Sequence, residues 1–228
     1  MLTLLFTAFL IFFLILSAGV MFLRFNYFLK AICSTDKPFV LLTFDDGPDP
    51  KTTPSILDNL AKYNVKALFF VIGKKAETHP ELIDRILDEG HSIGNHTYSH
   101  PPIFALMNGE KVKDQIVKFN QVLEKKGVKT NVFRPPVGYT NPIIARVIKN
   151  LNLKVIGWNK RSYDTVIFNS SWLSNRLLSQ AKAGSIILLH DNLKQTEAAL
   201  PMFLEKAREK GIIFANELDI KSILNENS

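Results

Sequence analysis

The stretch at residues 39–48, FVLLTFDDGP, constrains the fold of this chain more than any other segment. It begins as an apolar run of strand length and ends in two adjacent carboxylates, Asp45 and Asp46, before a Gly-Pro turn. This pattern predicts a buried strand that stops at the turn. Two carboxylates at the mouth of such a strand are costly unless a metal ion, an arginine or a proton compensates them. The alternative is that one acid caps the turn and the other is solvated. Which of the two holds depends on whether the remaining chain supplies partners for the two carboxylates.

Composition limits the classes of protein that the chain can represent. Its 228 residues are 46% hydrophobic and 21% charged, which predicts a folded domain with an appendage. The net charge of +7 is spread along the chain, and the densest basic stretch, residues 111–129, is interrupted by acids. We therefore expect no nucleic-acid partner, and no obligate protein partner is evident. Cys33 is the single cysteine, which excludes a disulfide within the chain and a thiolate metal cluster.

The first 23 residues contain no charged side chain, and Arg24 closes this apolar run. About 20 apolar residues suffice to cross a bilayer, so we expect an uncleaved single-pass anchor rather than a cleaved signal peptide. Arg24, Lys30 and Lys37 follow the run, and the positive-inside rule applied to them places the remaining chain in the cytoplasm. The expected domains are an anchor at 1–23, a linker at 24–37 and a catalytic domain at 38–228.

Apolar strand-like runs alternate with amphipathic helical patterns after residue 38. This alternation predicts an α/β fold with about seven parallel strands, either a barrel or an open doubly wound sheet. No glycine-rich dinucleotide or phosphate loop follows the first strand, and polar residues instead end several different strands, which favours a distorted (β/α) barrel. The expected strands lie at 39–44, 67–72, 91–95, 131–134, 154–158, 185–190 and 212–214.

Two histidines, His96 and His100, stand four residues apart just after the third expected strand. Together with Asp46 they would supply two imidazole nitrogens and one carboxylate, which is the ligand count of a catalytic rather than a structural metal site. The alternative is two solvated histidines in a polar loop. His79 and His91 are isolated in the sequence, and we interpret them as a helix-start and a strand-start residue.

Other polar residues end the later strands. Arg134 precedes two prolines that stiffen its loop, so its side chain could be aimed at an acid. The amide of Val137, in the same loop, could point into a site. Asp164 follows the fifth strand, and His190 ends the sixth. A histidine that emerges from an apolar strand is partly desolvated, and a nearby acid can tune its pKa.

Taken together and in their order along the chain, these residues resemble the motifs of the polysaccharide deacetylases with a NodB homology domain, which form carbohydrate esterase family 4. The resemblance covers about residues 38–215. The matching motifs are TFDDGP at 43–48, HTxxH at 96–100, RPPxG at 134–138, Asp164 and LxH at 188–190. The resemblance implies a distorted (β/α) barrel and metal-dependent removal of acetyl groups from N-acetylated sugars.

The resemblance also implies a metal site and its neighbours. Asp46, His96 and His100 would hold one divalent ion, most commonly zinc, with cobalt or nickel tolerated. Thr97 would brace the histidine loop. Leu188 would line the acetyl pocket.

Catalytic roles follow from the same resemblance. Asp45, oriented by Arg134, would be the general base. His190, tuned by Asp164, would protonate the departing amine. The Val137 amide would help to stabilise the oxyanion. The resemblance also implies a catalytic domain outside the cytoplasm, although the positive-inside rule places it inside.

The chain departs from the family pattern at two positions. The family often has an acid three residues before Asp164 and a tryptophan directly after it, where this chain has Arg161 and Thr165. Arg161 indicates either an anionic substrate contact or a surface arginine. Two other functions stay open: a non-catalytic carbohydrate-binding barrel, and an O-acetyl esterase with the same metal site. The glycan itself, whether peptidoglycan, chitin-like oligomer, exopolysaccharide or lipid-linked sugar, is not readable from the sequence.

Overall fold

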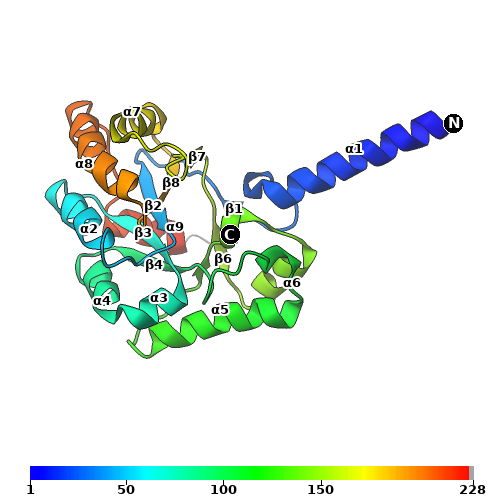
Figure 1. The fold of residues 1–228 in the computed structure, drawn as a ribbon, viewed down its shortest axis with the longest axis horizontal. Helices are drawn as coiled ribbons and strands as arrows, with labels where there is room; N and C mark the ends of the chain where they lie inside the picture. Colours follow the sequence, from blue (N-terminus) through cyan, green and yellow to red (C-terminus); the bar gives the residue numbers. More distant parts are fainter. Residues whose placement is uncertain (226–228) are drawn as a thin grey trace.

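A computed structural model describes residues 1–225, apart from the side chains of residues 2 and 4. Within this range, eight parallel strands form one curled sheet in the order β1-β6-β5-β4-β3-β2-β8-β7 (Figure 1). The α/β class and the parallel sheet are thus as predicted, and the curled shape fits a distorted barrel. The strands are β1 (Ala31–Ile32), β2 (Leu41–Asp45), β3 (Ala67–Val71), β4 (Ser92–Asn95), β5 (Val132–Phe133), β6 (Lys154–Ile156), β7 (Lys160–Arg161) and β8 (Ile186–His190).

Helices connect the strands, as a parallel sheet requires. Asparagine side chains cap three of them: Asn108, Asn141 and Asn169 each accept a hydrogen bond from the backbone N–H three residues later. The helices are α1 (Leu2–Met21), α2 (Thr53–Lys62), α3 (Gly73–Thr78), α4 (Pro80–Asp88), α5 (Gly109–Glu124), α6 (Pro142–Asn150), α7 (Ser170–Gln180), α8 (Lys194–Glu209) and α9 (Glu217–Asn225), with short 3-10 turns at Leu23–Phe25, Phe104–Leu106 and Pro136–Gly138.

The two faces of β2 belong to two different cores, because successive strand residues point to opposite faces. Leu42 and Phe44 of β2 belong to the core that packs against the outer helices, while Leu41 belongs to the core inside the curl. Ile220 and Ile223 of α9 belong to the same inner core. Thr43 and Asp45 alternate with the outward residues of β2 and therefore face the inside of the curl, where the polar site lies.

Helix α1 extends away from the rest of the chain (Figure 1). It ends at Met21, Phe22 is extended, and Leu23 is buried in the domain, so the apolar run at 1–23 is not one continuous helix. The backbone N–H of Thr140 donates to the carbonyl of Val20 at 3.1 Å, which ties the end of α1 to the domain. Among the described residues, no helix combines the length and the hydropathy that crossing a bilayer needs. The structure therefore does not support the membrane anchor, or the membrane partner, predicted for residues 1–23.

The observed strands differ from the predicted ones at three places. The expected linker at 24–37 contains β1, whose two residues pair with β6 at the sheet edge. Strand β7 was not expected, because Lys160 and Arg161 lack the apolar character of a buried strand. The expected last strand at 212–214 contributes only a single bridge between Val40 and Phe214.

Candidate metal centre and active site

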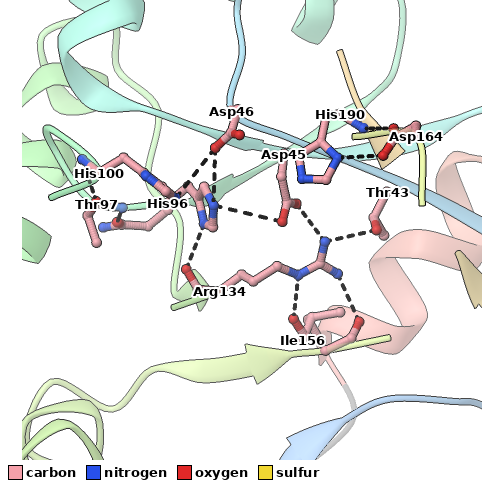
Figure 2. A network of polar contacts seen from close by, with 12 residues as sticks. Thr43, Asp45, Asp46, His96, Thr97, His100, Arg134, Ile156, Asp164 and His190 are labelled. Carbon is pink, nitrogen blue, oxygen red and sulfur yellow. Dashed lines mark hydrogen bonds and ion pairs between the residues drawn. The ribbon is translucent and has the colours of Figure 1, made fainter. Parts of the chain in front are cut away.

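The three predicted metal ligands lie together at the carboxyl ends of β2 and β4 (Figure 2). One ligand atom from each of Asp46, His96 and His100 lies within 4.8 Å of the other two. Asp46 Oδ1 is 3.6 Å from His96 Nε2 and 3.5 Å from His100 Nε2. The parallel sheet explains this meeting, because strand ends that are far apart in the sequence share one edge.

A hydrogen bond orients the His96 ring for ligation. Its Nδ1 lies 2.8 Å from the carbonyl oxygen of Arg134, an acceptor, so Nδ1 carries the proton and the lone pair of Nε2 faces Asp46. Burial lowers the pKa of His96 to about 3, despite the opposing charge of Asp46, and keeps the ring neutral. A neutral imidazole with a free Nε2 is the form that binds a metal ion.

The donor set fits a divalent ion in three further respects. Asp46 Oδ1 is buried without a hydrogen-bond partner, and an ion would satisfy this otherwise costly acceptor. Tetrahedral zinc with bonds of about 2.0–2.1 Å holds its ligands roughly 3.3 Å apart, close to the observed separations. Two nitrogens and one carboxylate oxygen also match the ligands of catalytic zinc sites.

The backbone around the ligands is held in uncommon conformations. Asp46, Thr97 and His100 have φ values of 72°, 69° and 48°, in the left-handed region that residues other than glycine rarely adopt. Lys75 Nζ donates to the carbonyl of Asp46 at 2.6 Å, and Thr97 Oγ1 accepts from the His100 N–H at 3.0 Å. The contact of Thr97 agrees with its predicted role as the brace of the histidine loop.

The predicted base, Asp45, pairs with a fully buried arginine. Arg134 Nη1 donates to Asp45 Oδ1 at 2.6 Å and to Thr43 Oγ1 at 2.9 Å. Nε and Nη2 of Arg134 donate to the carbonyls of Ile156 and Gly157, so the guanidinium cannot rotate. Burial raises the pKa of Asp45, and the charge of Arg134 opposes that shift. Asp45 thus has one fixed oxygen, while Oδ2 lies 3.8 Å from His96 Nε2.

The predicted acid, His190, lies at the end of β8 next to Asp164. Its Nδ1 is 2.8 Å from Asp164 Oδ1, and its backbone N–H donates to Asp164 Oδ2 at 2.8 Å. Thr196 Oγ1 donates to Asp164 Oδ2 as well, which fixes the carboxylate. Figure 2 shows Asp45 between the metal-ligand set on one side and His190 on the other.

The charge of Asp164 determines the protonation of His190. Burial alone would lower the pKa of His190, but the hydrogen bond and charge of Asp164 outweigh it and raise the pKa to about 9. We expect the wild-type ring to stay protonated at neutral pH and to lose its proton only as the pH rises through about 9. In Asp164→Asn, burial and the charges of Asp45 and Asp46 remain but the charge of Asp164 is gone, so the pKa of the ring should fall well below about 9. NMR titration of the histidine rings measures both values.

Asp219→Asn is the matched control for this titration, because the Asp219 carboxylate lies in the first turn of α9 and accepts a hydrogen bond from the backbone N–H of Asn216. That variant should leave the pKa of His190 unchanged. A wild-type ring that titrates near 6.5 would contradict the assigned charge state.

The remaining predicted residues lie at the edge of the site. Leu188 is buried on β8, in register with Thr43, and therefore faces the inside of the curl like His190. Val137 is half exposed, with φ of 60°, and its N–H takes part in no hydrogen bond among the described residues. Gly138, at φ of 78°, lies so close to Trp158 that a Cβ there would collide with the indole. The loop thus leaves one amide available beside Trp158.

Sequence reasoning missed one buried acid, Asp191. Its Oδ2 accepts from Thr53 Oγ1 at 2.7 Å, and its carbonyl accepts from Thr52 Oγ1, so neither threonine side chain caps α2. A Cβ at Gly47 would collide with the Asp191 carboxylate. Burial raises the pKa of Asp191 to about 7, with the nearby charge of Asp46 adding to the shift. The only sequence signal was its position directly after His190.

The other two histidines are structural, as predicted. His79 is the N-cap residue of α4. His91 is buried before β4, its Nδ1 accepts from the Ala67 N–H at 3.1 Å, and burial lowers its pKa to about 4. Neither belongs to the metal-ligand set.

Comparison with known proteins identifies the family. The polysaccharide deacetylase family model matches residues 33–156, more than half of the chain. A peptidoglycan-N-acetylglucosamine deacetylase from Bacillus cereus is 36% identical over 184 residues, which are 78% of this chain and 66% of that protein. The deacetylase PgdA from Listeria monocytogenes is 36% identical over 176 residues, which are 77% of this chain but only 37% of that protein.

A solved structure agrees with these sequence matches. The peptidoglycan deacetylase PdaC from Bacillus subtilis superimposes with a TM-score of 0.76 at 31% identity, over 82% of this chain and 92% of that chain. This superposition places the chain in the same structural class. The chain belongs to the polysaccharide deacetylase family, the NodB-homology group of carbohydrate esterase family 4.

Proposed function

We propose that the chain is a metal-dependent hydrolase that removes N-acetyl groups from the amino sugars of a glycan. The observation that carries this proposal is the position of Asp45, between a set of three metal ligands and the protonated His190. The names of the relatives, peptidoglycan and chitooligosaccharide deacetylases, support the same activity.

The residues would divide the reaction as follows. A divalent ion, most commonly zinc, held by Asp46, His96 and His100 would lower the pKa of water and polarise the acetyl carbonyl. Asp45 takes the proton from the attacking water, because Arg134 holds its carboxylate in place. As the new C–O bond forms, the carbonyl oxygen becomes an oxyanion, to which the Val137 N–H donates.

His190 acts in the second half of the reaction, in which the C–N bond breaks. Its Nδ1 is engaged by Asp164, which leaves Nε2 to face the substrate. When the C–N bond breaks, His190 gives its proton to the departing amine, and acetate and a free amino sugar result. A pKa near 9 keeps this acid charged at neutral pH. Leu188 lines the pocket that takes the acetyl methyl group.

The test is release of acetate by the full chain loaded with zinc, cobalt or nickel. N-acetylglucosamine oligomers and peptidoglycan serve as substrates, and free amine is measured beside acetate. Equal amounts of acetate and amine are expected. Acetate without amine, from an O-acetylated glycan, would indicate an esterase instead. No acetate from any substrate, with metal bound, would overturn the proposal.

We extend the proposal to location: the catalytic domain acts outside the cytoplasm. The support is the peptidoglycan named for several relatives, a polymer of the cell envelope. A C-terminal tag that external protease removes from intact cells would agree with this placement. A tag that becomes accessible only after lysis would contradict it.

A further inference from the structure

A cavity of about 580 Å³ lies beside the proposed active site, between the end of α1 and the segment from β7 to α7. Val137, whose amide is assigned to the oxyanion, lines it together with Tyr163, the neighbour of Asp164. The cavity therefore begins where the reacting sugar would lie. Its lining includes no carboxylate but five cationic side chains, namely Arg24, Lys160, Arg161, Arg176 and Lys182.

These five cations have no acidic partner within the described residues. None of them belongs to an ion pair, although other cations of the chain do, such as Lys126 with Asp84 at 2.6 Å. Five like charges around one cavity repel one another, and an anion bound among them would relieve that repulsion. Arginine is suited to carboxylate and phosphate groups, because its planar fork offers two parallel donors.

Arg161 is the cation placed nearest to the catalytic strand. In the register of the sheet it pairs with Leu188, two residues before His190 on β8. Its guanidinium lies 5.5 Å from the centre of the Tyr163 ring, and it donates no hydrogen bond among the described residues. Its side chain is exposed, so its donors are free for a ligand.

Arg176, in contrast, holds the segment in place. Its Nε donates to the carbonyl of Ser162 at 2.9 Å, and its Nη2 donates to the carbonyl of Arg161 at 3.2 Å. The same guanidinium lies 4.7 Å from the centre of the Tyr163 ring. Helix α7 therefore fixes the backbone that carries Arg161 beside the site. Arg161, where the chain departs from the family pattern, thus lies on a rigid surface whose positive charges have no acidic partner among the described residues.

We infer that this cavity binds a negatively charged group, a carboxylate or a phosphate, on the sugar next to the one that is deacetylated. The inference depends on the proposed function and names its substrate class, an acidic N-acetylated glycan. Charge-assisted hydrogen bonds from Arg161 hold the anion, and Lys160 and Lys182 add attraction. A neutral glycan leaves these cations unused.

The experiment compares kcat/KM for acetate release from three oligosaccharides of equal length, using the full metal-loaded chain. One is a neutral N-acetylglucosamine oligomer, the second alternates N-acetylglucosamine with glucuronic acid, and the third carries a phosphate on the neighbouring sugar. We expect at least a tenfold preference for one charged oligomer at low salt, and a smaller preference at 0.5 M salt. The two charged arms show whether carboxylate or phosphate is the ligand.

Variants then locate the effect. Arg161→Gln and Lys182→Gln should each reduce the ratio of charged to neutral kcat/KM by roughly threefold to tenfold, and Arg161→Lys should restore part of it. Arg146→Gln, which removes the same charge from an exposed position on α6, should leave the ratio unchanged. Equal kcat/KM for all three oligomers, or the same loss in Arg146→Gln as in Arg161→Gln, would overturn the inference.

Direct binding separates this inference from the proposed function. Calorimetry with the same oligomers and the full chain should show at least tenfold tighter binding of a charged oligomer than of the neutral one, and Arg161→Gln should remove the difference. If no substrate releases acetate but this binding difference is present, the subsite is supported and the hydrolase proposal fails. If acetate is released and the binding difference is absent, the hydrolase proposal is supported and the subsite fails.

Discussion

Replacing Asp45 with asparagine is expected to lower kcat for acetate release by about 10²–10⁴-fold, the usual contribution of a general base. Asparagine keeps the shape of the side chain and an oxygen that can accept from Arg134, but it cannot take a proton from water. Acetate release measures kcat, and calorimetry measures oligosaccharide binding by the same variant. Binding should persist, because Asp45 lies outside the cavity of five cations.

Asp58→Asn is the matched control for this substitution. Asp58 is an exposed acid that pairs with Arg85, so the same chemical change is made at a surface ion pair. It should leave kcat within about twofold, since exposed pairs contribute little. Wild-type kcat in Asp45→Asn would rule out Asp45 as the base.

Replacing Arg134 with methionine should destabilise the chain more than any other single change at the site. The side chain is fully buried and donates to Asp45, Thr43 and two backbone carbonyls. Its guanidinium also lies 4.0 Å from the centre of the Phe70 ring. Removing one partner of a buried pair leaves the other charge uncompensated, at a cost of about 3–5 kcal/mol. For a chain of this size the melting temperature should fall by roughly 6–20 °C, measured by calorimetry or circular dichroism.

Arg85→Met tests whether this loss depends on burial. Arg85 pairs with Asp58 and Glu89, but its side chain is 33% exposed. The same substitution there should cost less than about 1 kcal/mol, because solvent screens both pairs. Equal melting temperatures for the two variants would show that the buried Arg134 network contributes no more than a surface pair.

Much of the site could be predicted from the sequence, because its residues occupy strand ends. Asp45, His190 and Arg134 each follow an apolar run, and a parallel sheet brings the ends of such runs to one edge. Local sequence signals also mark the ends of two helices. Asn108 caps α5, and Gly90 follows α4 with a φ of 77°.

Other features depend on tertiary contacts that leave no local pattern. Thr52 precedes α2, yet its hydroxyl donates to the carbonyl of Asp191, 139 residues away, and does not cap the helix. Lys75 donates to the backbone of Asp46 from α3, a helix too short and polar to be predicted. Strands β1 and β7 have two residues each and exist only because neighbouring strands offer free edges.

The most direct test is the metal content of the chain. Mass spectrometry after dialysis should find one divalent ion per wild-type chain, and zinc titration should give an affinity at least about 100-fold weaker in Asp46→Asn and in His100→Ala. His79→Ala, a change at the start of α4, should keep the wild-type affinity. A wild-type chain that binds no ion, or Asp46→Asn and His100→Ala variants that bind zinc as tightly as the wild type, would contradict the metal centre at these three side chains.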